Sequence, residues 1–167
     1  MDIGEVFHAN YYSIVSILQL ARQRLFHAWF RLSRPMTLGV RAIVENERHE
    51  VVLVRHTYTP GLYFPGGGVE KAETTHTAIE RELVEEAGVQ LGSSAEMIGI
   101  FSNHANMPND HVVLYRVRHW TSVPIIDRGE IAEILWVDPH NPPEDTTPGT
   151  KRRLLEVYAG TPPSFYW

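Results

Sequence analysis

The sequence predicts an α/β protein of the α+β kind, in which helices cover both faces of a mixed β-sheet. Strand-like and helix-like segments follow one another without the strict alternation that builds a purely parallel sheet. The 167 residues are 43% hydrophobic and 21% charged, which is ordinary for a globular protein with one buried core. Because no internal repeat or long linker divides the chain, we expect one main domain.

The first 35 residues are expected to form an amphipathic helical extension ahead of the main domain, which then spans 36–167. The apolar stretch at 11–32 contains Arg22 and Arg24, so it lacks the roughly 20 uninterrupted apolar residues of a membrane span. A basic amphipathic helix can instead lie on a membrane surface. Packing against its own domain or in a homodimer is the commoner use of such a helix, so we expect no membrane association and leave a homodimer open.

The composition limits the classes of function. A formal net charge of −5 disfavours a nucleic-acid binder, because lysine and arginine contacts to phosphates supply most non-specific affinity. The absence of cysteine excludes disulfides, thiolate nucleophiles and cysteine-ligated zinc. A cysteine-free chain also fits a reducing compartment, so a cytoplasmic location is expected. A small phosphorylated ligand that binds together with a metal remains compatible with this composition.

Strand signals in the main domain are short runs of aliphatic, β-branched and aromatic residues. Pro35 ends the N-terminal helix, because proline cannot continue it. Strands are then predicted within 36–55 on both sides of a polar turn at 45–50, and at 97–101, 111–117 and 134–138. The segment 56–73 holds six glycine and proline positions and is predicted to be a shaped loop rather than a regular element.

Two helices are predicted in the main domain, at 74–87 and near 147–160. In the first, Ile79, Leu83 and Ala87 recur with helical spacing and mark the buried face. A glycine follows each helix at the position where a left-handed residue commonly ends it. The second helix starts with a threonine and a proline, which suits a first turn.

Three carboxylates gather on the helix at 74–87. Glu82, Glu85 and Glu86 lie three and four residues apart, so an α-helix places them on one face. Like charges at this spacing repel by roughly 0.2–0.5 kcal/mol per pair. They form a merely solvated surface or, with a phosphate, a site for a hard divalent cation such as Mg²⁺. The glycines of the preceding loop, Gly66 and Gly67, let the backbone approach such a ligand closely.

The spacing from Gly67 through Glu73 to the run RELVEEAGV at 81–89 resembles the Nudix box at every defined position. The chain is therefore identified as a member of the Nudix hydrolase family. Two residues depart from the usual pattern. Ala72 stands where the family usually has glycine, and if its φ angle is positive it costs on the order of 1 kcal/mol. Leu62 stands where an aromatic residue is common.

The resemblance implies an α/β/α sandwich and hydrolysis of the diphosphate bond in a nucleoside diphosphate derivative or a nucleoside triphosphate, with release of a nucleoside monophosphate. It implies Mg²⁺, with Mn²⁺ as a second option, and a small-molecule nucleotide substrate. An idle Nudix domain that only binds and senses nucleotides is the alternative.

Carried over by position, the resemblance also implies roles for single residues. Glu82, Glu85 and Glu86 match the family's metal-binding and catalytic glutamates, and Arg81 matches the arginine that orients a glutamate. Glu73 matches the acid before the helix, which reaches the metal directly or through water. The metal set is completed by the carbonyl oxygen of Gly66, and Gly67 matches the first residue of the box.

The general base has four candidates: Glu85, Glu86, Glu130 and Glu133. The last two precede a predicted strand, where relatives often place an extra acid, but a solvated turn is an equally simple explanation of both.

Substrate contacts are expected outside the glutamate run. Tyr63 and Phe64 can stack on a base or wedge the loop against the core. His104 and Asp110 are candidates for contacts to phosphate or ribose, and Gly67 for close backbone approach. The positions that mark the ADP-ribose and dinucleoside polyphosphate subfamilies carry neither signature, so the substrate is left open. The final SFYW segment packs against the domain or against a partner.

Overall fold

The computed structural model describes residues 22, 24–26, 29, 35–126 and 129–167. The chain divides into two units, Met1–Pro35 and Met36–Trp167. In the first unit the described residues 22, 24–26 and 29 are helical, and the rest of the amphipathic helix predicted for 1–35 lies outside the described residues. None of the helices that the structure describes is long and apolar enough to cross a membrane.

The main sheet of the second unit is mixed, as predicted. Its strand order is β1 (Thr37–Val44), β5 (Asp110–Val117) and β4 (Glu96–Ser102). β1 runs parallel to β5, and β4 runs antiparallel to β5. Because β1 and β5 are distant in sequence, the parallel pairing brings the start of the domain against its middle.

Two further pairs of strands flank this sheet. β2 (Val51–His56) pairs antiparallel with β7 (Ile131–Val137). The strands β3 (Val89–Leu91) and β6 (Trp120–Ser122) form the other pair and were not predicted, because three residues are too few to show an alternating pattern. The segment 57–74 contains only isolated bridges, in agreement with the predicted loop.

The helix after this loop has two parts. α2 (Thr75–Glu82) is α-helical, and the Thr74 side chain caps it by accepting a hydrogen bond from the backbone N–H of Thr77. The helix continues as one wider π-helical turn, η1 (Leu83–Ala87). It ends at Gly88, which has a φ of 62°. Gly88 therefore stops the helix as predicted, but the π-turn changes how the glutamates are spread around it.

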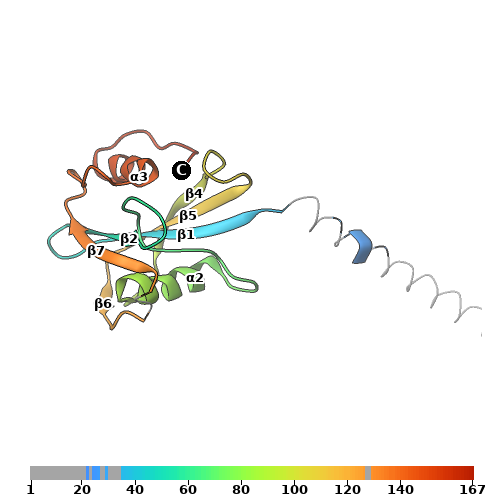
Figure 1. Cartoon of the computed structure of the whole chain (residues 1–167), viewed down its shortest axis with the longest axis horizontal. Coiled ribbons are helices and arrows are strands. Elements are labelled where there is room, and N and C mark those ends of the chain that lie inside the picture. Colours follow the sequence, from blue (N-terminus) through green and yellow to red (C-terminus); the bar gives the residue numbers. More distant parts are fainter. Residues whose placement is uncertain (1–21, 23, 27–28, 30–34, 127–128) are drawn as a thin grey trace, which may run out of the picture. The chain divides into compact units, whose positions relative to one another are not determined.

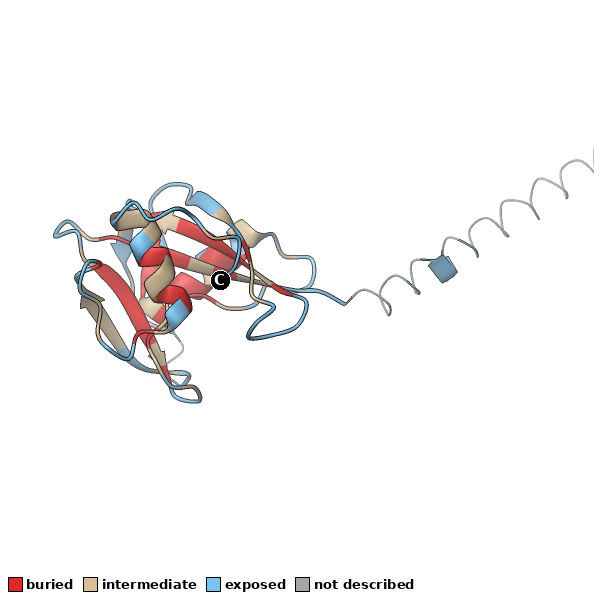
Figure 2. Cartoon of the chain, turned by 90° about the horizontal axis from the view of Figure 1, so that it is seen from above, coloured by how far each residue is buried: buried red, intermediate tan, exposed pale blue. Residues whose placement is uncertain are grey.

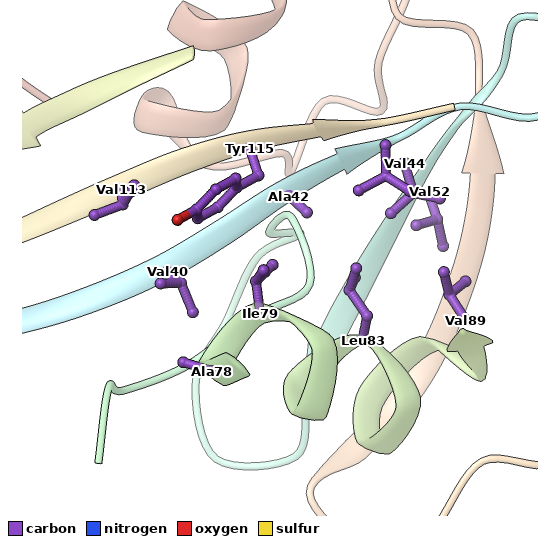
Figure 3. Close-up of a cluster of buried hydrophobic side chains, with 11 residues drawn as sticks. Val40, Ala42, Val44, Val52, Ala78, Ile79, Leu83, Val89, Val113 and Tyr115 are labelled. Atoms are coloured by element: carbon purple, nitrogen blue, oxygen red, sulfur yellow. The ribbon is translucent and has the colours of Figure 1, made fainter. Parts of the chain in front are cut away.

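Helices cover both faces of the sheet, and α3 (Pro148–Tyr158) lies on the side opposite α2 (Figure 1). On the α2 side, Ile79 and Leu83 pack with Val40, Ala42 and Val113 of the sheet in one apolar cluster (Figure 3). On the α3 side, a second apolar cluster joins Leu154 of α3 to strand and loop residues. The buried residues accordingly run along the strands between the helices (Figure 2). This is the sandwich that the sequence predicted.

Candidate active site

The glycine loop is held against β1 by the backbone. The N–H of Ala42 donates to the carbonyl of Pro65 at 3.0 Å, and the N–H of Val40 donates to the carbonyl of Gly67 at 2.9 Å. The carbonyl of Gly66 lies between these two acceptors in the chain and accepts no hydrogen bond from the described residues. Gly66 has a φ of 139°, which favours glycine. The loop thus leaves one carbonyl oxygen without a hydrogen-bond partner among the described residues.

Glu86 is fastened to this loop. The N–H of Gly66 donates to Oε2 of Glu86 at 2.8 Å, and the residue is only 6% exposed. Burial raises the pKa of Glu86 to about 7, although the Gly66 N–H and the nearby Arg41 guanidinium oppose the rise. The buried carboxylate therefore lacks a full counter-charge, which a cation could supply.

Glu82 lies one turn earlier and touches the loop at Gly67. A Cβ atom on Gly67 would lie 2.7 Å from Cδ of Glu82, so a larger residue there would have to displace this carboxylate. Glu82 is 8% exposed, and burial raises its pKa against the opposing effect of Arg81.

Arg81 connects the acidic residues. Its guanidinium donates to Glu73 at 3.0 and 3.2 Å, to Glu82 at 2.7 Å and to Glu85 at 3.2 Å. It also donates to the carbonyl of Gly68 at 3.1 Å. These hydrogen bonds lower the pKa of Glu73 and raise that of Arg81. Arg81 therefore binds glutamates from the loop and the helix at once.

The π-turn separates the three glutamates that an α-helix would align. Glu82 and Glu86 are buried and line a cavity, whereas the Glu85 side chain is 36% exposed and does not line it. π-turns occur frequently at functional sites, where they change the direction of single side chains. The local sequence pattern did not reveal this turn, because the apolar spacing is compatible with an unbroken α-helix.

The oxygen atoms of this site are chemically suited to a hard divalent cation. Two buried carboxylates and a free carbonyl are oxygen ligands of the kind that Mg²⁺ and Mn²⁺ prefer. Within the described ranges, however, no three carboxylate or imidazole side chains are grouped closely enough to hold a metal. Glu73, Glu82 and Glu85 turn toward Arg81 instead.

A cavity of about 850 Å³ opens beside these carboxylates. Among the residues predicted to contact substrate, Tyr63, Gly67 and Asp110 line it. Phe64 does not, because its ring is fully buried in the apolar cluster on the α3 side. His104 is exposed and lies outside the lining, although its neighbours in the same loop take part.

Asp110 is the first residue of β5 and holds the loop before it. Thr37 Oγ1 donates to one carboxylate oxygen at 2.6 Å, and Asn103 Nδ2 donates to the other at 2.7 Å. Because both oxygens are engaged, the side chain fixes the start of β5 against β1.

The two acids after β6 occupy different places. Glu130 lines the cavity, and its backbone carbonyl accepts a hydrogen bond from Thr57 at 2.8 Å. Glu133 pairs with Arg55 across β2 and β7 at 3.0 Å and does not line the cavity.

Arg41, Arg152 and Trp167 line the cavity but were absent from the predicted site. Nothing in the local pattern marked the two arginines. Trp167 belongs to a segment whose docking the sequence left open.

Comparisons with known proteins bear on the family and the fold of the chain. A family model described as the NUDIX domain matches residues 35–158. A Bacillus subtilis protein with "8-oxo-dGTP diphosphatase" in its name is 30% identical over 124 residues, which are 74% of this chain and 81% of that protein. An ADP-ribose pyrophosphatase of Methanocaldococcus jannaschii is 26% identical over 113 residues, 66% of this chain and 65% of that protein. The crystal structure of a MutT NUDIX hydrolase from Burkholderia pseudomallei has the same fold, with a TM-score of 0.63 and 20% identity over 72% of this chain and 97% of that one.

Proposed function

The chain belongs to the Nudix hydrolase family, and on that premise we propose that it cleaves a diphosphate bond in a nucleotide and releases a nucleoside monophosphate. The substrate is a nucleoside triphosphate or a nucleoside diphosphate linked to another group. The single observation that supports this most is the pair of buried glutamates, Glu82 and Glu86, at the wall of an 850 Å³ cavity. A cavity of that size falls in the range of small-molecule sites.

The similar proteins narrow the substrate class but not the substrate. One carries 8-oxo-dGTP in its name and another ADP-ribose, and both compounds are nucleotides with a diphosphate bond. We carry over only this shared chemistry. The cytoplasmic setting expected from the cysteine-free sequence is part of the same proposal.

The metal in this proposal is Mg²⁺, with Mn²⁺ as a substitute. Glu82, Glu86 and the Gly66 carbonyl would hold it. Glu73 and Glu85, the other two members of the proposed metal set, are paired with Arg81 at 3.0 and 3.2 Å. A bound divalent cation neutralises phosphate oxygens and lowers the pKa of its water.

The protein's own groups supply the remaining functions. Arg41 lines the cavity and donates to the carbonyl of Phe64 at 2.9 Å, so its charge is fixed where phosphate oxygens would bind. Glu130, directly before β7, lines the cavity and can accept the proton of an attacking water. Arg81 keeps Glu82 and Glu85 in place.

A substrate panel tests the proposal. The purified full chain is incubated with Mg²⁺ and with 8-oxo-dGTP, dGTP, ADP-ribose and a nucleotide sugar, and release of nucleoside monophosphate is measured. Turnover of at least one compound, lost on removal of the metal, supports the proposal. Nucleotide binding by calorimetry without any product would favour the idle, ligand-binding alternative.

A further inference from the structure

The segment 164–167 lies on the domain beside the end of β4 and is joined to it by an isolated bridge. The N–H of Ser102 donates to the carbonyl of Phe165 at 2.9 Å, and the N–H of Trp167 donates to the carbonyl of Ser102 at 2.9 Å. Ser102 and Tyr166 form a parallel bridge. The segment therefore packs on its own domain, and the sequence left that choice open.

Two arginines of α3 fix this segment. Arg153 is 0% exposed, its guanidinium lies 3.9 Å from the ring centroid of Phe101, and its Nη2 donates to the carbonyl of Tyr166 at 3.1 Å. Arg152 donates through Nη1 to the carbonyl of Trp167. A buried arginine with these partners makes the position of the segment specific rather than incidental.

Trp167 is presented to the cavity by these contacts. Its ring meets that of Phe101 edge-on, with centroids 6.1 Å apart, and the residue lines the cavity. Gly149 lies directly against the indole, because a Cβ atom there would be 2.5 Å from Nε1. The Arg153 guanidinium lies 5.9 Å from the centroid of the indole ring, which is only partly buried, and the indole N–H donates to no group in the described part of the chain. The part of the residue that lines the cavity is therefore open to a ligand.

The indole and the glutamates belong to opposite layers of the sandwich. Glu82 and Glu86 project from the helix that covers one face of the sheet, and Trp167 packs with the apolar cluster on the other face. Both nonetheless line the same cavity. A nucleotide whose diphosphate lies at the glutamates has its base some distance from them, so the base requires a surface elsewhere in the cavity.

The two tyrosines of the cavity lie close to the glutamates. The Tyr63 ring has the Arg41 guanidinium 5.7 Å from its centroid and His56 at 5.6 Å. Tyr58 packs on the same His56, which lies 3.7 Å from Glu86. Both tyrosines therefore belong to the end of the cavity where the phosphates are expected.

We propose that Trp167 is the stacking surface for the nucleobase and thus a specificity-determining residue; this inference rests on the proposed function above. An aromatic ring stacks on any base, and one stacked base contributes enough binding to change affinity by roughly 5- to 100-fold. The subsite therefore selects nucleotides over diphosphates that lack a base.

Three variants of the full chain test the proposal. Trp167→Ala removes the ring, whereas Trp167→Phe keeps an aromatic surface. Gly149→Ala retains the tryptophan but displaces it, and alanine is a better helix former than glycine in α3. Phe165→Ala is the matched control, because Phe165 belongs to the same segment but is 87% exposed and does not line the cavity.

Affinity for AMP and for ribose 5-phosphate is measured by calorimetry with Mg²⁺, and KM is measured for the best nucleotide and for 5-phosphoribosyl 1-diphosphate. Trp167→Ala and Gly149→Ala are expected to weaken AMP binding and raise the nucleotide KM by about 5- to 100-fold, with kcat and the base-free ligands little changed. Trp167→Phe should recover most of the affinity, and Phe165→Ala should change nothing.

Equal losses for base-containing and base-free ligands, or an unchanged AMP affinity in Trp167→Ala, would overturn the inference. The binding comparison needs no turnover, so it remains decisive if no nucleotide is hydrolysed. Conversely, wild-type hydrolysis with no effect of Trp167→Ala contradicts only the inference and leaves the proposed function intact.

Discussion

Gly67 and Glu82 are in direct contact, and a Cβ atom on Gly67 would lie 2.7 Å from the carboxylate carbon of Glu82. Real Cβ atoms essentially never come so close to another heavy atom. The first glycine of the loop therefore leaves the space that a buried carboxylate occupies.

Substitution of this glycine is expected to disturb the site without changing any acidic residue. Gly67→Ala should displace Glu82 and lower kcat/KM by on the order of 10- to 100-fold, as loss of a residue that orients metal ligands does. Gly68→Ala is the control, because a Cβ there meets nothing within 4 Å. Steady-state kinetics of both variants decide the matter, and equal activities would contradict the contact.

Glu130 and Glu133 are predicted to differ although they are three residues apart. Glu130 lines the cavity, whereas Glu133 pairs with Arg55 at 3.0 Å. If Glu130 accepts the proton from water, Glu130→Gln should lower kcat by on the order of 10²- to 10⁴-fold. Glu133→Gln removes an exposed ion pair and should leave kcat nearly unchanged. A lower kcat in Glu133→Gln together with an unchanged kcat in Glu130→Gln would show that Glu130 is not the base.

Metal affinity should depend on pH through Glu86. Its pKa is raised to about 7 by burial, so below that pH a proton competes with the cation for the carboxylate. We expect Mg²⁺ affinity, measured by calorimetry, to fall by up to about tenfold per pH unit below 7. The pH dependence should be much weaker in Glu86→Gln, and an equal slope in both proteins would exclude Glu86 as its source.

The raised pKa of Glu86 also affects the stability of the metal-free protein. Stability falls as the pH rises, whereas metal affinity increases. A carboxyl whose folded pKa is raised from 4.5 to about 7 stabilises the fold below 4.5 and loses that contribution as the pH rises through 7. Glu86→Gln should therefore unfold at a higher temperature than the metal-free wild type at pH 8, as measured by calorimetry.

Ala72 has a φ of 65°. A positive φ is the condition under which alanine at this position was expected to cost free energy of folding. Ala72→Gly should raise the free energy of unfolding by about 0.5–1 kcal/mol, because glycine adopts this conformation without strain. Ala132→Gly, at the exposed second residue of β7 where φ is not positive, is the control and should lower it by a similar amount. Denaturant unfolding of both variants measures these changes. Destabilisation by Ala72→Gly would show that the backbone of Ala72 is not strained.

The sequence predicted much of this molecule because its strongest signals are local. The glycine and proline loop, the stop at Gly88 and the apolar stripe of Ile79 and Leu83 all depend on nearby residues. The structure places Glu82 and Glu86 together, as the helix pattern indicated.

The remaining features depend on distant contacts. The π-turn that separates Glu85 from Glu86 leaves the apolar spacing compatible with an α-helix. The sequence allows Phe64 either to stack on a base or to pack in the core. Only its contacts on the α3 side show that its ring lies in the core. Trp167 reaches the cavity through pairing with Ser102, far away in the chain, so no local pattern could place it.

Under the proposed function, Glu86 supports metal-dependent cleavage of a nucleotide diphosphate. The most direct test compares nucleoside monophosphate release by wild type, Glu86→Gln and Glu80→Gln, with Mg²⁺ and with chelator. Glu80 is exposed on the same helix and serves as the control. We expect metal-dependent release by wild type and Glu80→Gln, and a loss on the order of 10²-fold or more in Glu86→Gln. Full activity of Glu86→Gln, or release that persists with chelator, would contradict the account.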